Sequence, residues 1–349
     1  MEVLFSLFLY ELFNIHGLGS FSNAFFKLRT PSPLNPIYNR GMNKNPIIRR
    51  NAKELIENRI FDNGKALFLY NSCFYGEKFT LFRALWREAF RQYGVGLDFK
   101  TSENIGYSNK YDFSELLYDT IVFYDKDISL ASRLERAGFK VINPSKAIRI
   151  CDSKIETGIF LTEHNIPKIP FLLSPLQFEG SEHDAMYFLS KLGGEIRFPI
   201  VIKEEFGSLG EQVYLANNEL EAIDIIMKIH PPKRFIIEPY YENKGEDHRL
   251  YIVGDKVIGA IRRKNPSDFR SNIELGGKGY PYDPSEKEVE IALSASKALN
   301  LDFSGVDILL DEKGKPLICE VNSCPRFLGL LDATGINMAK EIAKYLFSK

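Results

Sequence analysis

Three side chains that could bind a metal, Asp307, Glu320 and Asn322, lie close together near the end of the sequence. Asp307 interrupts one short apolar run, and Glu320 and Asn322 stand two residues apart at the end of the next. Side chains two residues apart on a β-strand share a face. Carboxylate and amide oxygens suit Mg²⁺, which usually also binds substrate phosphates. The pattern predicts either a magnesium site or, as the alternative, a satisfied polar residue at a sheet edge beside an ordinary strand-end charge.

The elements that carry these residues are predicted to form a β-hairpin over 305–327. Alternating apolar residues on both sides of the sequence DEKGKP indicate two strands joined by a turn. An amphipathic helix is predicted before it, over 283–301, with Asp283 as its cap and Glu286 completing a capping box. A last helix, over 336–347, is predicted to pack against the same sheet.

A possible phosphate site lies earlier in the chain, around Lys203. This lysine ends a strand-like run, FPIVIK, and the sequence GSLG follows at 207–210. Backbone N–H groups of a glycine-containing loop can face an anion, and a lysine beside them can neutralise it. The order differs from the Walker loop, because the lysine precedes the glycines. A solvated lysine at a strand end is the alternative interpretation.

Two further segments carry polar residues where strands end. The run PPKRFIIEPY is predicted to end a buried strand at Glu238, where the backbone could meet an adenine ring. Asp247 and Arg249 share one face of a predicted hairpin, by the two-residue period of a strand. The loop KNPSDFRSNIELGGKG follows and carries Arg270. It is too polar for a core and long enough to be functional.

The first part of the chain is predicted to be a scaffold rather than a catalytic centre. Strands alternate with helices from Lys65 and predict a small parallel-sheet domain over 65–150, which could form a wall on the substrate side. Residues 1–64 are predicted to be an N-terminal extension, either from a mispredicted start or partly disordered. A packed helix within the first 41 residues is the alternative.

The composition argues against several classes of protein. The 349 residues include 45 basic and 46 acidic ones, so no overall charge favours nucleic acid or an anionic membrane. The four cysteines lack zinc-site spacing and indicate no disulfide framework, which fits a reducing cytoplasm. The apolar opening MEVLFSLFLYELF contains two glutamates and falls short of the roughly 20 residues that span a membrane. We therefore expect a cytoplasmic protein without nucleic-acid or membrane partners.

Taken in order, these motifs resemble the ATP-grasp superfamily and, within it, the RimK-like ligases. The resemblance spans 65–349 and depends on DFRSN, GGK, GVDILL and EVNS together. It implies an α/β (α+β) ATP-grasp fold behind an N-terminal parallel-sheet (pre-ATP-grasp) domain. The implied boundaries are 65–150 for that domain, 151–235 for the central subdomain, and 236–349 for the C-terminal subdomain with the metal site.

The resemblance also implies ATP and two Mg²⁺ or Mn²⁺ ions as cofactors. It assigns two lysines to the phosphates, the end of a strand to the adenine-side hinge and an aspartate to the ribose region. The implied ATP-binding residues are Lys154, Lys203, Gly207, Ser208, Gly210, Glu238, Pro239, Asp247, Arg270, Ser271 and Asn272. The implied metal ligands are Asp307, Glu320 and Asn322, and the implied catalytic residues are Arg270, Lys203 and Arg249.

The implied reaction is an ATP-dependent carboxylate–amine ligation. A carboxylate attacks the γ-phosphate, an acylphosphate forms, and an amine displaces phosphate to leave an amide and ADP. Glutamate or a similar amino acid would be joined to a peptide, protein or metabolite, and a homo-oligomer is the default assembly. Changing Asp307 or Glu320 should then abolish turnover with the fold intact.

Three alternatives stay open at this point: a thiol acceptor, an acid other than glutamate, and a non-catalytic nucleotide-binding sensor or scaffold. The chain also departs from the family pattern at Arg326, where many relatives carry a glycine. This arginine either recognises an acidic group on the acceptor or is solvated.

Overall fold

The computed structural model describes residues 64–105, 113, 116–194 and 196–348. All of these belong to one compact unit, residues 43–349. The predictions for residues 1–63 therefore lie outside the described residues. No helix in the described part of the chain is long and apolar enough to cross a membrane.

The first sheet is parallel, as the sequence predicted, and has the strand order β2-β1-β3-β4. Its central strands are continuous apolar runs because helices cover both faces. The chain crosses from β1 to β2 on one side and then returns to place β3 on the other, so a topological switch point lies between β1 and β3. The elements are β1 (Lys65–Tyr70), α3 (Glu77–Arg91), β2 (Gly96–Thr101), β3 (Thr120–Tyr124), α4 (Ile128–Arg136) and β4 (Lys140–Ile142).

The second sheet is antiparallel, with the order β5-β8-β6-β7. Its core joins apolar side chains of β6 and β8 to helices α7 and α8. Both central strands end in charged or polar residues that face the site described below. The elements are α5 (Ser145–Asp152), α6 (Lys154–Glu163), β5 (Leu172–Leu173), α7 (Ala185–Leu189), β6 (Ile200–Glu204), β7 (Val213–Ala216), α8 (Glu219–Ile226) and β8 (Phe235–Pro239).

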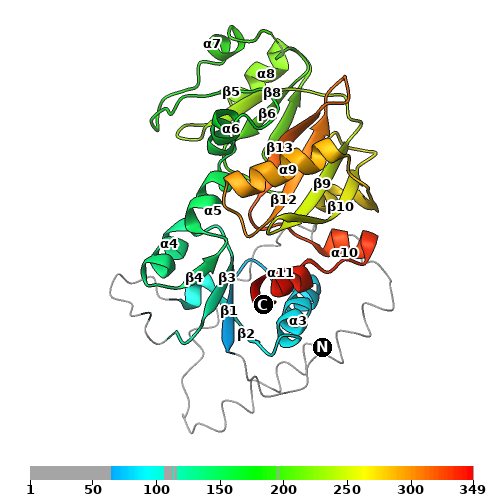
Figure 1. Cartoon of the computed structure of the whole chain (residues 1–349). Helices are drawn as coiled ribbons and strands as arrows, with labels where there is room; N and C mark the ends of the chain where they lie inside the picture. The colour runs from blue at the N-terminus through cyan, green and yellow to red at the C-terminus, as the bar shows by residue number, and fades with distance from the viewer. Residues whose placement is uncertain (1–63, 106–112, 114–115, 195, 349) are drawn as a thin grey trace, which may run out of the picture. The chain divides into compact units, whose positions relative to one another are not determined.

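The third sheet has five antiparallel strands in the order β11-β10-β9-β12-β13 and contains the predicted hairpin as β12 and β13. Figure 1 shows α9 lying across this sheet. The opposite face carries the aromatic core that joins it to α3. The elements are β9 (Glu246–Val253), β10 (Lys256–Lys264), β11 (Lys278–Pro281), α9 (Glu286–Ala298), β12 (Phe303–Leu310), β13 (Pro316–Asn322), α10 (Leu328–Thr334) and α11 (Met338–Phe347).

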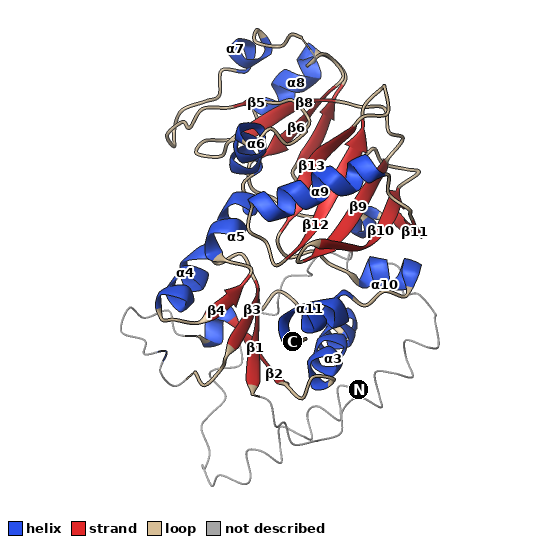
Figure 2. Ribbon diagram, in the orientation of Figure 1, coloured by secondary structure: helices blue, strands red, loops and turns tan. Residues whose placement is uncertain are grey.

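The predicted cap of one helix needs correction. The cap of α9 is Ser285 rather than Asp283, and Glu288 rather than Glu286 completes the capping box. Glu288 also accepts a hydrogen bond from Tyr282 and contacts His248, so tertiary contacts add to the local capping signal. The last helix, α11, packs against α3 of the first sheet as well as against β9, so it joins two sheets (Figure 2).

Candidate active site

One pocket collects the predicted site residues from segments far apart in the sequence. Its walls come from the ends of β6 and β8, the glycine-containing loop 207–212, the loop 265–277 and the hairpin of β12 and β13. All of the predicted site residues line this pocket except Arg249 and Asn322. Those lining it are Lys154, Lys203, Gly207, Ser208, Gly210, Glu238, Pro239, Asp247, Arg270, Ser271, Asn272, Asp307 and Glu320.

The register of the hairpin places Asp307 directly opposite Glu320, and Gly305 opposite Asn322. A β-bulge next to Asp307 produces this pairing. Because a bulge inserts one residue into one strand, it changes which side chain faces a given partner. The three predicted metal ligands are therefore neighbours at one end of the hairpin.

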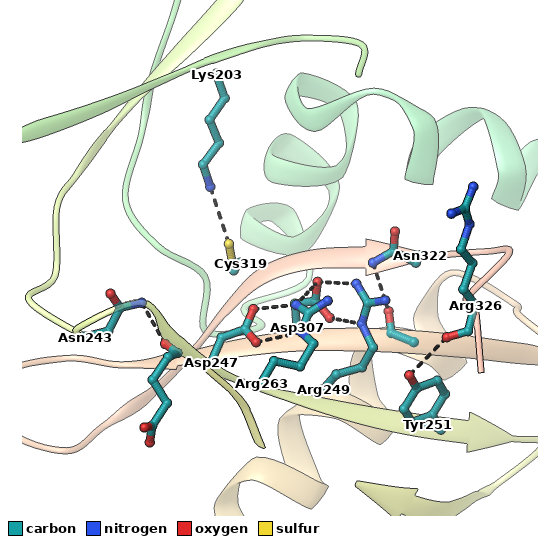
Figure 3. Close-up of polar contacts among 12 residues, drawn as sticks. Lys203, Asn243, Asp247, Arg249, Tyr251, Arg263, Asp307, Cys319, Asn322 and Arg326 are labelled. Atoms are coloured by element: carbon teal, nitrogen blue, oxygen red, sulfur yellow. Dashed lines mark hydrogen bonds and ion pairs between the residues drawn. The ribbon is translucent and has the colours of Figure 1, made fainter. Parts of the chain in front are cut away.

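Asp307 is the centre of a buried ion-pair network (Figure 3). Arg249 donates to both of its oxygens, Nε to Oδ1 at 2.5 Å and Nη2 to Oδ2 at 2.6 Å. Nη2 of Arg263 donates to Oδ2 at 2.8 Å, and the same guanidinium forms a two-point ion pair with Asp247. These four residues occupy one face of β9, β10 and β12, the face that also carries Tyr251 in the aromatic core.

The network keeps the carboxyl group of Asp307 ionised. Burial by itself raises the pKa of this carboxyl, but the charges and hydrogen bonds of Arg249 and Arg263 outweigh it, and the pKa is lowered. Asp307 is thus an ionised, satisfied residue on an inner strand, with β9 on one side and β13 on the other. It does not lie at a sheet edge.

The hairpin end has the donor chemistry of a magnesium site. A carboxylate offers about four lone-pair positions, and hydrogen bonds from the arginines use three of those on Asp307. Glu320 is partly exposed, and within the described residues its carboxylate has no hydrogen bond or ion pair to a side chain. Among the described residues, the side chain of Asn322 makes only a long 3.5 Å contact, from its Nδ2 to the carbonyl of Gly305.

The oxygens of Glu320, Asn322 and Asp307 therefore fit a hard divalent ion that takes further ligands from phosphate. Within the described residues no group of three or more His, Cys, Asp and Glu side chains forms a metal cage. Asn322 adds an amide oxygen to the carboxylates at this end of the hairpin, and Mg²⁺ usually takes further ligands from water and substrate phosphates.

A second buried ion-pair cluster surrounds Glu238 at the end of β8. Its carboxylate accepts from Lys168 Nζ at 2.7 Å and from Lys203 Nζ at 2.5 Å, and all three side chains are almost fully buried. Burial raises the pKa of Glu238, but the two ammonium groups outweigh this effect and lower it. Both oxygens of Glu238 are thus occupied by lysines, which leaves the backbone of this strand end and Pro239 facing the pocket.

Arg270 joins two loops across the pocket. Its Nη1 donates to the carbonyl of Gly210 at 2.6 Å, and Asp268 holds the rest of the guanidinium through Nε at 3.0 Å and Nη2 at 2.7 Å. A Cβ on Gly277 would lie 2.3 Å from the carbonyl oxygen of Ser271, so this loop closes only with glycine at that position. The loop therefore presents Arg270 in a defined place.

Sequence reasoning missed four residues that build the site: Lys168, Arg263, Asp268 and Asn143. Asn143 is fully buried after β4 and closes the base of the hairpin. Its Nδ2 donates to the carbonyls of Phe303 at 2.8 Å and Ser323 at 2.7 Å. The DFRSN motif itself offered a signal for Asp268, since Asp268 stands two residues before the arginine it holds. The other three depend on contacts between distant segments.

Comparison with known proteins places this geometry in a family. Residues 152–346 match the RimK-like ATP-grasp domain. The probable alpha-L-glutamate ligase 2 of Shewanella amazonensis is 42% identical over 233 residues, which cover 66% of this chain and 74% of that protein. N-acetylaspartylglutamate synthase A of Homo sapiens is 29% identical over 226 residues, covering 64% of this chain and 56% of that protein.

A solved structure shows the same fold at low sequence identity. The structure of D-cycloserine synthetase DcsG aligns with a TM-score of 0.63 at 18% identity and covers 81% of this chain and 99% of that one. The matched family domain spans more than half of the chain. The protein therefore belongs to the RimK-like ATP-grasp family of ligases, which use ATP together with Mg²⁺ or Mn²⁺.

Proposed function

We propose that this protein is an ATP-dependent carboxylate–amine ligase that forms an amide or peptide bond and releases ADP and phosphate. One observation carries the proposal: a single pocket brings Lys154, Lys203 and Arg270 together with Glu320 and Asp307. Phosphoryl transfer needs mainly positioning and neutralisation of charge, and basic side chains beside metal-binding oxygens provide both.

Different lining residues of the pocket are assigned to the purine, the phosphates and the ribose of ATP. Ile169, Val201 and Leu309 give an apolar surface for the purine, beside the hinge at Pro239. We assign the phosphates to the basic residues and the loop between them, and the ribose region to Asp247. The proposed ATP contacts are Lys154, Lys203, Gly207, Ser208, Gly210, Glu238, Pro239, Asp247, Arg270, Ser271 and Asn272.

In the proposed reaction the carboxylate of the first substrate attacks the γ-phosphorus, and ADP leaves. The amine of the second substrate then attacks the acylphosphate carbon and displaces phosphate. Asp307, Glu320 and Asn322 would hold a divalent ion, which would supply neutralisation of charge on the phosphates. Arg249 does not line the pocket and is held by Asp307, so we assign it the role of orienting that carboxylate.

The nearby thiols give no reason to invoke a covalent enzyme intermediate. Burial raises the pKa of Cys319, which lines the pocket, to about 11. Burial likewise raises the pKa of Cys324 to about 12. Since the thiolate is the nucleophilic form, both groups are unreactive near neutral pH.

The relatives support a substrate class for the proposed reaction. The Shewanella protein is described as a probable glutamate ligase, which supports glutamate or a similar amino acid as one substrate and a peptide, protein or metabolite as the other.

The test is release of ADP and phosphate in a matrix of amino acids and amine acceptors, with Mg²⁺ present and with Mg²⁺ chelated. We expect release that requires Mg²⁺, one acid and one amine together, with Glu320→Gln as the blank. Nucleotide binding without release in any combination would contradict a ligase acting on these substrate classes. Release that requires a thiol in place of the amine would reassign the acceptor.

A further inference from the structure

A lysine that follows the first sheet, Lys126, contacts the glycine-containing loop 207–212, and the reaction outlined above does not use it. Lys126 follows β3, and its Nζ donates to Ser208 Oγ at 3.2 Å. The same ammonium forms an ion pair with Asp152 at the end of α5. Its side chain is about half exposed, at 49%, whereas that of Asp152 is mostly covered at 17%.

The fold places Lys126 where ligands meet sheets of this kind. It stands just beyond the carboxyl end of β3, at the switch point between β1 and β3. In open parallel sheets, ligands bind outside the carboxyl ends of the strands at such a point. A side chain that reaches from there to the loop 207–212 connects the first sheet with the pocket.

Two lysines contact consecutive residues of that loop. Lys154 Nζ contacts the carbonyl of Gly207 at 3.4 Å, and Lys126 contacts Ser208. Both loop residues line the pocket. Burial lowers the pKa of Lys154, the charge of Glu320 opposes that effect, and the charges of Lys203 and Lys126 add to it. The charges of Glu320, Lys203 and Lys126 therefore all act on Lys154.

We propose that Lys126 is a further phosphate-binding residue of this site and contacts the terminal phosphoryl group of the nucleotide, the group that is transferred. The proposal rests on the proposed function. Asp152 and Ser208 hold the ammonium when no phosphate is bound, and the flexible lysine stem lets it turn to the γ-phosphate. The competing interpretation is a surface ion pair between Lys126 and Asp152, which contributes little by itself.

The experiment compares affinities for Mg²⁺–AMPPNP and Mg²⁺–ADP by titration calorimetry, because only the first carries a terminal γ-phosphate group. For Lys126→Met we expect affinity for AMPPNP to fall about tenfold relative to ADP, the loss expected for one charge-assisted hydrogen bond. Asp152→Asn should not weaken AMPPNP binding, because it releases the same ammonium. Lys146→Met, at an exposed position of α5, is the matched control.

The outcomes separate the two interpretations. An unchanged ratio of the two affinities in Lys126→Met, or an equal loss in Lys126→Met and Asp152→Asn, would overturn the proposal and identify a structural ion pair. Melting temperatures of the variants check that each is folded. If the wild-type protein binds neither nucleotide, the proposed function fails and this inference fails with it. Wild-type binding with an unchanged ratio defeats the inference alone.

Discussion

Replacing Glu320 with glutamine is expected to lower Mg²⁺-dependent ADP release by about 1000-fold, because metal-bound charge stabilisation contributes several kcal/mol to such steps. The folded state should be unaffected. Glu320 is partly exposed and has no ion pair with a described side chain, so its charge contributes to the site rather than to the core.

Initial rates of ADP release over a Mg²⁺ titration measure this effect, with urea unfolding as the check on stability. Glu312→Gln is the matched control, since Glu312 is exposed in the turn of the same hairpin. It should behave like the wild type in both assays. If Glu320→Gln kept more than a tenth of the wild-type rate at every Mg²⁺ concentration, Glu320 would not be a metal ligand.

Replacing Arg263 with methionine is expected to lower the free energy of unfolding by about 3–5 kcal/mol, the cost of breaking a buried ion pair from one side. Arg263 is 3% exposed and pairs with both Asp247 and Asp307. Its removal leaves Asp247 without its two-point partner and Asp307 with Arg249 alone.

Urea unfolding measures this loss, and the neighbouring arginine supplies the control. Arg262 points to the other face, its side chain is 44% exposed, and it makes a 3.8 Å ion pair with Glu246 and an exposed cation–π contact with Tyr280. Arg262→Met should therefore change stability by less than about 1 kcal/mol. Equal effects of the two substitutions would show that the buried network does not stabilise the fold.

Because of this buried network, substitutions of Asp307 and of Glu320 are expected to have different effects. The sequence predicted that changing Asp307 or Glu320 would leave the fold intact. For Glu320 this stays a prediction. Asp307 is buried between two arginines, so Asp307→Asn should lower stability as well as turnover. Activity lost in an Asp307 variant is thus weaker support for metal binding than activity lost in Glu320→Gln.

The sequence was sufficient for the elements that carry the site, because apolar periodicity and turn residues are local signals. It predicted a parallel sheet within 65–150 and the hairpin of β12 and β13, and both are present. The registers in which neighbouring strands pair could not be predicted from the sequence. Continued without a bulge, the turn of β9 and β10 would place Arg262 opposite Asp247, whereas a shift near Val257 brings Arg263 there.

The second bulge has the same effect in the metal hairpin. Pairing from Leu310 and Pro316 alone would set Cys319 opposite Asp307, and the shift sets Glu320 there instead. A bulge moves every later side chain by one position, which exchanges the residues of the two faces. No local pattern in this sequence marks either bulge, so the partners of the charged residues could not be predicted.

Contacts between distant segments account for the remaining differences. Lys168 and Glu238 are 70 residues apart in sequence and meet only when β8 lies beside the segment after α6. Lys126 and Ser208 are 82 residues apart. Sequence reasoning therefore identified the ATP-grasp family and most pocket residues by their types and order, while the buried partners that orient them required the structure.

The most direct test of the account follows an ¹⁸O label from the acid substrate. The acid and amine identified by the substrate matrix are supplied with the acid labelled in both carboxylate oxygens, and the released phosphate is examined by mass spectrometry. Activation by phosphorylation predicts one labelled oxygen in the phosphate for each amide formed. Amide formation with unlabelled phosphate would contradict the account, because the carboxylate oxygen would then never have been bonded to the γ-phosphorus.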